Sequence, residues 1–299
     1  MVTSQASPAA TFATSFKTIL FAIDFASPSE AALPYLLSLA QSFDSTVIAV
    51  HAVPFEALSG LAAVPPMIEF DAEWRDALQA MRAYERTHPF TGLRHEFVLE
   101  HGPLREVIED VATQRDADLI VLGTHGRQGL RKVFAGSFAE EIFRTVTCPI
   151  LIVGPGVAHT PPIDWTPRRI VFATDFSDGS LRALACALTL AEANNARLVL
   201  MHAVPLVPWE QQSELDVKYQ EQLRKLIPEN MPHRCMIDVA VKFDLPAPAI
   251  LGAAEEAEAD LIVMGVHHAR LPRVDAHFPG TTAADVISNA QCPVLTACG

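Results

Sequence analysis

The feature that most constrains the fold is a tandem repeat. Four sequence blocks in the first half recur in the same order in the second half. They are residues 19–24 with 170–175, 50–54 with 201–205, 117–123 with 259–265, and 148–151 with 292–295. Blocks that keep their order over so long a period indicate a duplicated domain and not a short-period solenoid.

The length fits two domains. A chain of 299 residues divides naturally into two domains of roughly 150 residues each. We expect a flexible tail over 1–15, a first domain over 16–154, a proline-stiffened linker over 155–166 and a second domain over 167–298. The tail has neither the basic nor the apolar region of a signal peptide.

The composition narrows the class of protein. Hydrophobic residues make up 50% of the chain and charged residues 19%, which is typical of a packed globular protein. No apolar run approaches the roughly 20 residues needed to span a bilayer, so we expect no membrane association. The net charge of -13 disfavours nucleic acid as a partner.

The cysteines indicate a reducing compartment. There are five, without a CxxC pair, so a disulfide framework is not expected. Cys148 and Cys292 occupy equivalent places before the last strand of each repeat, and we interpret them as small buried residues. We therefore expect a cytoplasmic protein with reduced thiols.

Short β-rich apolar runs alternate with helical stretches in each repeat. The ten expected strands are 17–24, 46–53, 93–99, 118–123, 149–153, 169–175, 197–204, 235–242, 260–265 and 292–297. Runs such as 18–23 are apolar on both faces, as interior parallel strands are. The alternation predicts an α/β fold of two tandem, doubly wound domains with helices on both faces of each sheet.

One expected helix start has a recognisable signature. Ser27, Pro28, Ser29 and Glu30 form the pattern of a capping box, with Ser27 as the N-cap and Glu30 at the third helical position. Residues 72–84 follow an amphipathic helical pattern.

A glycine-rich motif follows the fourth expected strand. Gly123 and Gly126 are separated by two residues, and nine more residues precede Gly136 and Ser137. Glycines let a polyanion approach the backbone, and a following helix start offers free N–H groups and a positive dipole end. The loop also carries Arg127, Arg131 and Lys132. This arrangement indicates a phosphate site.

With these residues in view, the chain resembles a tandem member of the universal stress protein family. The resemblance rests on the glycine motif, on Asp24 at the end of the first strand, on residues 51–53 and on residues 148–151. It implies two five-stranded parallel sheets of strand order 3-2-1-4-5. It also implies that ATP, alone or with Mg²⁺, lies across the ends of strands one and four, where an open α/β sheet binds ligands.

The resemblance also implies roles for single residues. The expected nucleotide-binding set is Asp24, Ala52, Gly123, His125, Gly126, Arg127, Gly136, Ser137 and Phe138. The Asp24 carboxylate would bind the ribose or adenine region, and the Ala52 backbone would read the adenine edge. Structural alternatives stay open: Asp24 as a residue that satisfies N–H groups at the helix start, the glycines as turn residues, His125 as a cover for the loop, and Ser137 as a helix cap.

The second repeat departs from the motif. Gly265 is retained, but His268 replaces the second glycine, and eleven residues instead of nine precede Gly280. A side chain at 268 obstructs the close approach of phosphates, so we expect a degenerate loop without ATP, although Asp175 remains. The histidines of this loop match no zinc spacing, and we expect no metal site there.

No catalytic constellation is visible in the sequence, so we expect at most weak ATP hydrolysis or autophosphorylation. The favoured function is a stress-response protein in which bound ATP sets a conformation or association state that unknown protein partners read. A non-nucleotide scaffold and a slow ATPase are the alternatives. Family members commonly dimerise through the last strand. Residues 150–153 and 294–296 are thus expected to form a pseudo-dimer within one chain, and a homodimer stays open.

Overall fold

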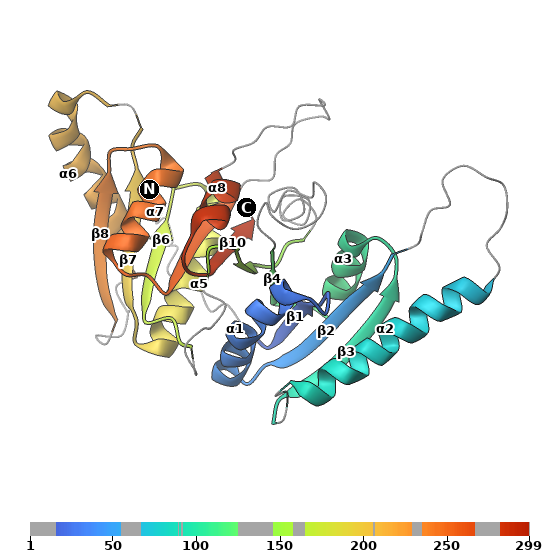
Figure 1. Ribbon diagram of the computed structural model, residues 1–299. Helices are drawn as coiled ribbons and strands as arrows, with labels where there is room; N and C mark the ends of the chain where they lie inside the picture. Colours follow the sequence, from blue (N-terminus) through green and yellow to red (C-terminus); the bar gives the residue numbers. More distant parts are fainter. Residues whose placement is uncertain are drawn as a thin grey trace, which may run out of the picture. The chain divides into compact units, whose positions relative to one another are not determined.

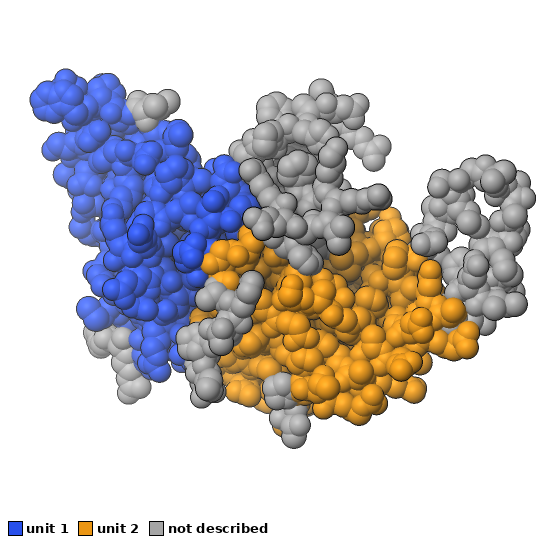
Figure 2. All heavy atoms as spheres, in the orientation of Figure 1, with its two compact units in different colours: residues 1–15, 166–299 blue, residues 16–165 orange. Residues whose placement is uncertain are grey.

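The computed structural model divides into two compact units (Figure 2). In chain order, we call residues 16–165, orange in Figure 2, the first unit, and residues 166–299, blue in Figure 2, the second unit. The structure describes residues 16–54, 67–88, 90, 92–124, 146–157, 165–205, 207–228, 235–266 and 282–298.

The first unit is a parallel sheet whose strands are connected by helices (Figure 1). Its elements are β1 (Thr18–Ala22), α1 (Ser27–Phe43), β2 (Thr46–Val53), α2 (Met67–Thr87), β3 (Arg94–His101), α3 (Leu104–Gln114), β4 (Leu119–Gly123) and β5 (Ile150–Val153). The strands lie in the order β3-β2-β1-β4-β5, and each neighbouring pair is parallel.

The second unit repeats this arrangement. Its elements are β6 (Arg169–Ala173), α5 (Asp178–Asn194), β7 (Arg197–Ala203), α6 (Trp209–Lys225), β8 (Met236–Lys242), α7 (Pro246–Glu256), β9 (Leu261–Val266), α8 (Thr282–Asn289) and β10 (Val294–Cys298). The strand order is β8-β7-β6-β9-β10, again with parallel pairs. The predicted α/β fold with tandem doubly wound domains is confirmed, and every predicted strand is present within two residues at either end.

The strand order decides which face each helix covers. The chain crosses the first sheet from β1 to β3 in one direction and returns past β1 to β4 and β5. Because parallel crossovers are right-handed, α1 and α2 lie on one face and α3 lies on the other. In the second unit α7 and α8 pack against each other, while α5 packs on β9 and β10.

The strands at the centre of each sheet form the core. Ile19, Leu20 and Phe21 of β1 are all 0% exposed, although successive side chains point to opposite faces. Both faces of β1 are therefore covered, which is why the sequence reads as an uninterrupted apolar run.

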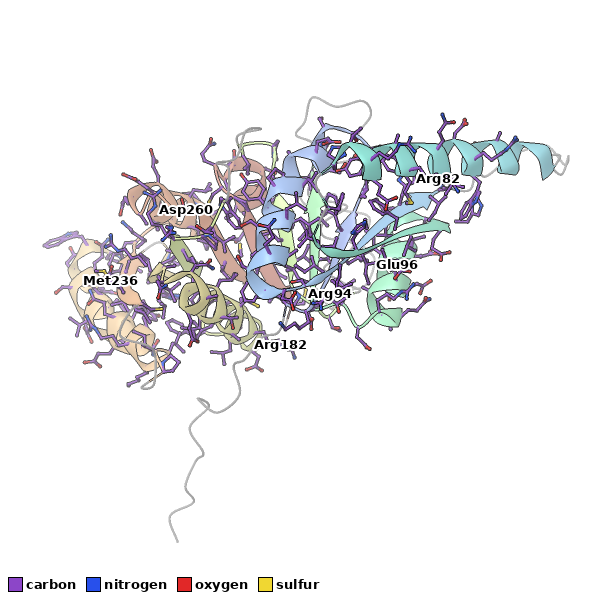
Figure 3. All side chains as sticks on the ribbon, turned by 90° about the horizontal axis from the view of Figure 1, so that it is seen from below. Arg82, Arg94, Glu96, Arg182, Met236 and Asp260 are labelled. Atoms are coloured by element: carbon purple, nitrogen blue, oxygen red, sulfur yellow. The ribbon has the colours of Figure 1, made fainter. Side chains whose placement is uncertain are left out.

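The outer strand β3 is more polar, as an edge strand should be. Arg94 pairs with Asp44 at 3.0 Å between Nη2 and Oδ2, and Glu96 pairs with Arg115 at 2.6 Å. Figure 3 labels Arg94 and Glu96 on this strand. Both ion pairs are substantially exposed, so their main role is to keep the edge solvated.

An aspartate before β4 and its counterpart before β9 hold the amino ends of the sheets. The Asp118 carboxylate accepts hydrogen bonds from the backbone N–H groups of Lys17 and Thr18 at 2.8 and 2.9 Å. Asp260, labelled in Figure 3, does the same for Arg168 and Arg169 at 3.1 and 3.0 Å. These aspartates recur in the repeat because they tie the first strand of each unit to the fourth.

The cysteines are not disulfide-bonded. Cys292 is buried, as predicted, and burial raises the pKa of its thiol to about 12. Cys148 is only partly buried, so the prediction of a buried residue is wrong there.

Candidate functional site

The candidate site of the first unit lies where β1 and β4 are neighbours. From β1 the chain moves across the sheet toward β2, and from β4 it moves the other way toward β5. Open α/β sheets bind ligands at the carboxyl ends of the strands at such a point. Asp24 follows β1 and Thr124 follows β4, so the sequence places polar side chains at both strand ends.

Gly123 lies at the end of β4, where α1 begins to pack on the sheet. A Cβ added to Gly123 would lie 1.9 Å from the carbonyl oxygen of Pro28 and 2.3 Å from its carbonyl carbon. Only glycine therefore allows α1 to approach β4 this closely. The sequence pattern predicted phosphate wrapping or a turn for this glycine, and the helix–strand contact was not predicted.

Asp24 is exposed and supports the start of α1. Its Oδ1 accepts hydrogen bonds from the Ala26 backbone N–H at 3.0 Å and from the Ser29 hydroxyl at 2.6 Å. The N-cap is Ala26, which makes no side-chain cap bond, so the predicted capping box at Ser27 is wrong. The structural alternative for Asp24 is present, while its Oδ2 accepts no hydrogen bond from the described residues and stays available to a ligand.

Ala52 has an unpaired backbone at the end of β2. The Val50 carbonyl accepts the Ile23 N–H at 2.9 Å, so the parallel ladder would next bring the Ala52 N–H to the Ile23 carbonyl. That carbonyl instead accepts a hydrogen bond from His51 Nδ1 at 2.8 Å. On the other side of β2 the Val53 carbonyl accepts the Gly102 N–H at 3.0 Å, so Val53 bonds toward β3 and Ala52, one residue earlier, faces β1. Among the described residues no backbone bond joins Ala52 to the end of β1, which leaves a donor and an acceptor there.

His51, which belongs to the motif 51–53 but was given no role of its own, is a further functional candidate. Because a carbonyl can only accept, the bond to Ile23 fixes the proton of a neutral His51 on Nδ1. Its ring lies 4.5 Å from the ring of Phe25, measured between centroids. Phe25 has a left-handed φ of 56°, which is rare for an aromatic residue. The recurrence of His51 as His202 in the second repeat was the sequence signal that could have identified this histidine.

Tyr84 of α2 contributes a buried hydroxyl beside these rings. The residue is 5% exposed, its ring centroid lies 5.8 Å from that of Phe25, and its hydroxyl has no partner within the described part of the chain. Burial, and then the charges of Glu30 and Asp24, raise the pKa of Tyr84. The hydroxyl therefore stays protonated and is able to donate.

His88 connects α2 to α1 at the same place. Its Nε2 lies 2.8 Å from Glu30 Oε2, and its ring stacks on Tyr84 with 3.8 Å between centroids. This contact joins the two helices that flank the end of β1.

Replacing Tyr84 with phenylalanine is expected to stabilise the ligand-free protein by about 1 kcal/mol, because it removes a buried hydroxyl without a partner. Urea unfolding measures the change. The matched control is Tyr219→Phe in α6, where the residue is partly exposed and the expected change is near zero. A clear loss of stability in Tyr84→Phe would show that the hydroxyl is satisfied in solution.

The second unit repeats much of this geometry. His202 Nδ1 donates to the Thr174 carbonyl at 2.7 Å, and Phe176 has a φ of 64°. A Cβ on Gly265 would lie 2.5 Å from the Ser180 backbone nitrogen. The helix start differs, because the Ser177 hydroxyl caps α5 by accepting from the Ser180 N–H at 3.3 Å.

Several predicted site residues lie outside the described part of the chain. They are His125, Gly126, Arg127, Gly136, Ser137 and Phe138, together with the loop residues 267–281 of the second repeat. The structure thus brings together Asp24, Ala52 and Gly123, and the role of the glycine loop stays a prediction. Within the described ranges there is no cluster of three or more His, Cys, Asp or Glu residues suited to a metal.

The sequence model of the universal stress protein family matches residues 15–154 and again residues 166–297. This chain belongs to the universal stress protein family. The double match confirms the tandem resemblance. In the described part of the chain no helix is both long and apolar enough to cross a membrane.

Individual relatives agree with the family. A universal stress protein of Methanocaldococcus jannaschii is 29% identical over 147 residues, which are 46% of this chain and 82% of the relative. One of Thermus aquaticus is 34% identical over 137 residues, 43% of this chain and 96% of the relative. A crystal structure of a universal stress protein from Archaeoglobus fulgidus aligns with a TM-score of 0.68 at 20% identity, covering 94% of this chain and 97% of that one. At this identity the structural match supports the fold.

Proposed function

We propose that the first unit binds ATP at the carboxyl ends of β1, β2 and β4, and that the bound nucleotide sets a conformation or association state read by stress-response partners. The observation that carries this proposal is the unpaired N–H and C=O of Ala52 beside Asp24. They lie at the point where the chain reverses its direction across the sheet. The loop after β4 carries the nucleotide spacing Gly123, Gly126, Gly136 and Ser137.

The described residues suit the nucleoside part of ATP. Adenine presents an acceptor and a donor side by side at N1 and N6, which complement one backbone N–H and one C=O. The Asp24 carboxylate has a free oxygen for a ribose hydroxyl. A carboxylate oxygen with the phosphates is also the ligand type that Mg²⁺ prefers, so Asp24 fits either role.

The loop supplies the phosphate part of the proposal. Gly123, Gly126 and Gly136 would admit the phosphates, with Ser137 and the Phe138 backbone at the following helix start. Arg127 and His125 would add positive charge or a donor. In the second unit His268 replaces a glycine, so we propose one ATP per chain.

The proposed function is a switch and not an enzyme. Efficient phosphoryl transfer needs groups that orient a nucleophile and stabilise the transferred phosphoryl, and the sequence carries no motif of this kind. ATP bound without rapid turnover shifts a conformational equilibrium by its differential affinity for the two states. A scaffold that needs no nucleotide is the competing function, and a binding measurement separates the two.

Native mass spectrometry of the full chain with Mg-ATP tests this proposal. We expect one ATP per wild-type chain and none in Gly126→Asp, because the new carboxylate adds bulk and negative charge where phosphates would bind. His268→Asp is the matched control in the second repeat and should keep one ATP. Two ATP molecules per chain would overturn the asymmetry, and no ATP at millimolar concentration would favour the scaffold.

A further inference from the structure

The strand end that carries Thr124 is held from two sides. The Thr124 backbone N–H donates to the Val153 carbonyl of β5 at 3.0 Å. The preceding Gly123 contacts the Pro28 backbone so closely that no Cβ fits between them. The Thr124 side chain therefore starts from a fixed backbone position, where the glycine loop begins.

The Thr124 hydroxyl oxygen is buried and has no hydrogen-bond partner in the part of the chain that the structure describes. A buried polar group without a partner disfavours the folded state. An orphaned hydroxyl on a fixed backbone therefore calls for a reason beyond folding.

The second unit shows that the fold does not require this hydroxyl. Val266 follows Gly265 as Thr124 follows Gly123, and Gly265 is packed against the start of α5 in the same way. Val266 is 7% exposed and pairs in the sheet with Cys298. Valine differs from threonine by a methyl group in place of the hydroxyl, so the same position accepts an apolar side chain.

Two further differences separate the units. The start of α1 has no side-chain cap, whereas α5 is capped by Ser177. The repeat with valine also has His268 in place of the loop glycine. The hydroxyl is thus present in the half whose loop suits phosphates and absent from the half whose loop does not.

We propose that the Thr124 hydroxyl donates a hydrogen bond to a phosphate oxygen of the bound nucleotide and so helps select phosphorylated ligands in the first unit. A hydroxyl that donates to an anionic oxygen makes a charge-assisted bond. The ligand thereby satisfies the group that the protein leaves unpaired. This inference rests on the proposed function and deepens it.

Calorimetric titration of the full chain with Mg-ATP and with adenosine provides the test. Thr124→Val should weaken ATP binding by about 10- to 100-fold, which is the loss expected for one hydrogen bond to a charged group. Adenosine, which has no phosphate, should bind as to the wild type. Thr124→Ser keeps a hydroxyl and should recover most of the ATP affinity. The ligand-free melting temperature of Thr124→Val should stay level or rise.

Val266→Thr is the matched control in the second unit. It should lower the melting temperature, because it buries an unpaired hydroxyl, and leave ATP affinity unchanged. Equal ATP affinities of the wild type and Thr124→Val would overturn this inference while the proposed function stands. Failure of the wild type itself to bind ATP would overturn both.

Discussion

Gly265→Ala and Gly123→Ala are each expected to destabilise the protein by about 3 kcal/mol or more, at the upper end of the range for overpacking. The added Cβ would lie 1.9 Å from the Pro28 oxygen at position 123 and 2.5 Å from the Ser180 nitrogen at position 265. Both obstructing atoms belong to the backbone of a helix start. A flexible side chain cannot move aside to relieve the contact, so the helix must shift from the sheet.

Gly252→Ala supplies the opposite control. Gly252 lies inside α7, and a Cβ there would meet nothing within 4 Å. Alanine has the higher helix propensity, so this variant should be more stable by about 0.5–1 kcal/mol. Urea unfolding followed by circular dichroism compares the three variants, and hydrogen exchange locates the change. Stability of Gly123→Ala equal to that of Gly252→Ala would contradict the packing role.

The close packing of Gly123 and Gly265 changes how the glycine motif is interpreted. Gly265, in strand β9, persists although the motif has lost its second glycine, and packing against α5 explains why. The first glycine of the motif is therefore weak evidence for a nucleotide, since both units need it for the fold. Evidence for phosphate binding has to come from Gly126, Gly136 and the Thr124 hydroxyl.

The sequence predicted the α/β fold well because its main signal is local. Interior strands such as β1 are buried on both faces, which forces an apolar run, whereas the strand order was expected from the family resemblance alone. The predicted capping box was wrong because a short pattern does not include the residues before it. Residues 27–30 do not show that Asp24 accepts hydrogen bonds from Ala26 and Ser29.

Asp24 and Ala52 of the candidate site were expected from the family resemblance, and their contact with a nucleotide stays a prediction. Other contacts were missed because they join residues that are far apart in the sequence. The hydrogen bonds of His51 at the site and of Asp118 at the opposite, amino end of the strands were not predicted, although both residues recur in the second repeat as His202 and Asp260. Their partners are backbone groups 28 and about 100 residues away in sequence, which no local pattern shows. For Thr124 the sequence signal is a difference and not a recurrence, because Val266 stands at the equivalent position after otherwise matching blocks.

Ala52→Pro is expected to reduce ATP affinity by about 10- to 100-fold, with the folded structure retained. A backbone donor can be deleted only by proline, which has no N–H. The Ala52 N–H makes no hydrogen bond within the described residues, so the sheet loses no ladder bond. A ligand that depends on this donor loses it and leaves its own acceptor unpaired, which costs about 1–3 kcal/mol. Calorimetric titration with Mg-ATP measures the change.

Two other proline variants give this experiment its controls. Ala203→Pro removes the equivalent N–H at the end of β7 and should leave ATP affinity unchanged, because the second unit is not the proposed site. Val50→Pro lies inside β2, where the backbone bonds to β1, and should prevent folding. Wild-type ATP affinity in a folded Ala52→Pro would remove the observation on which the proposed adenine contact rests. Lost affinity in Ala203→Pro would instead move the nucleotide to the second unit.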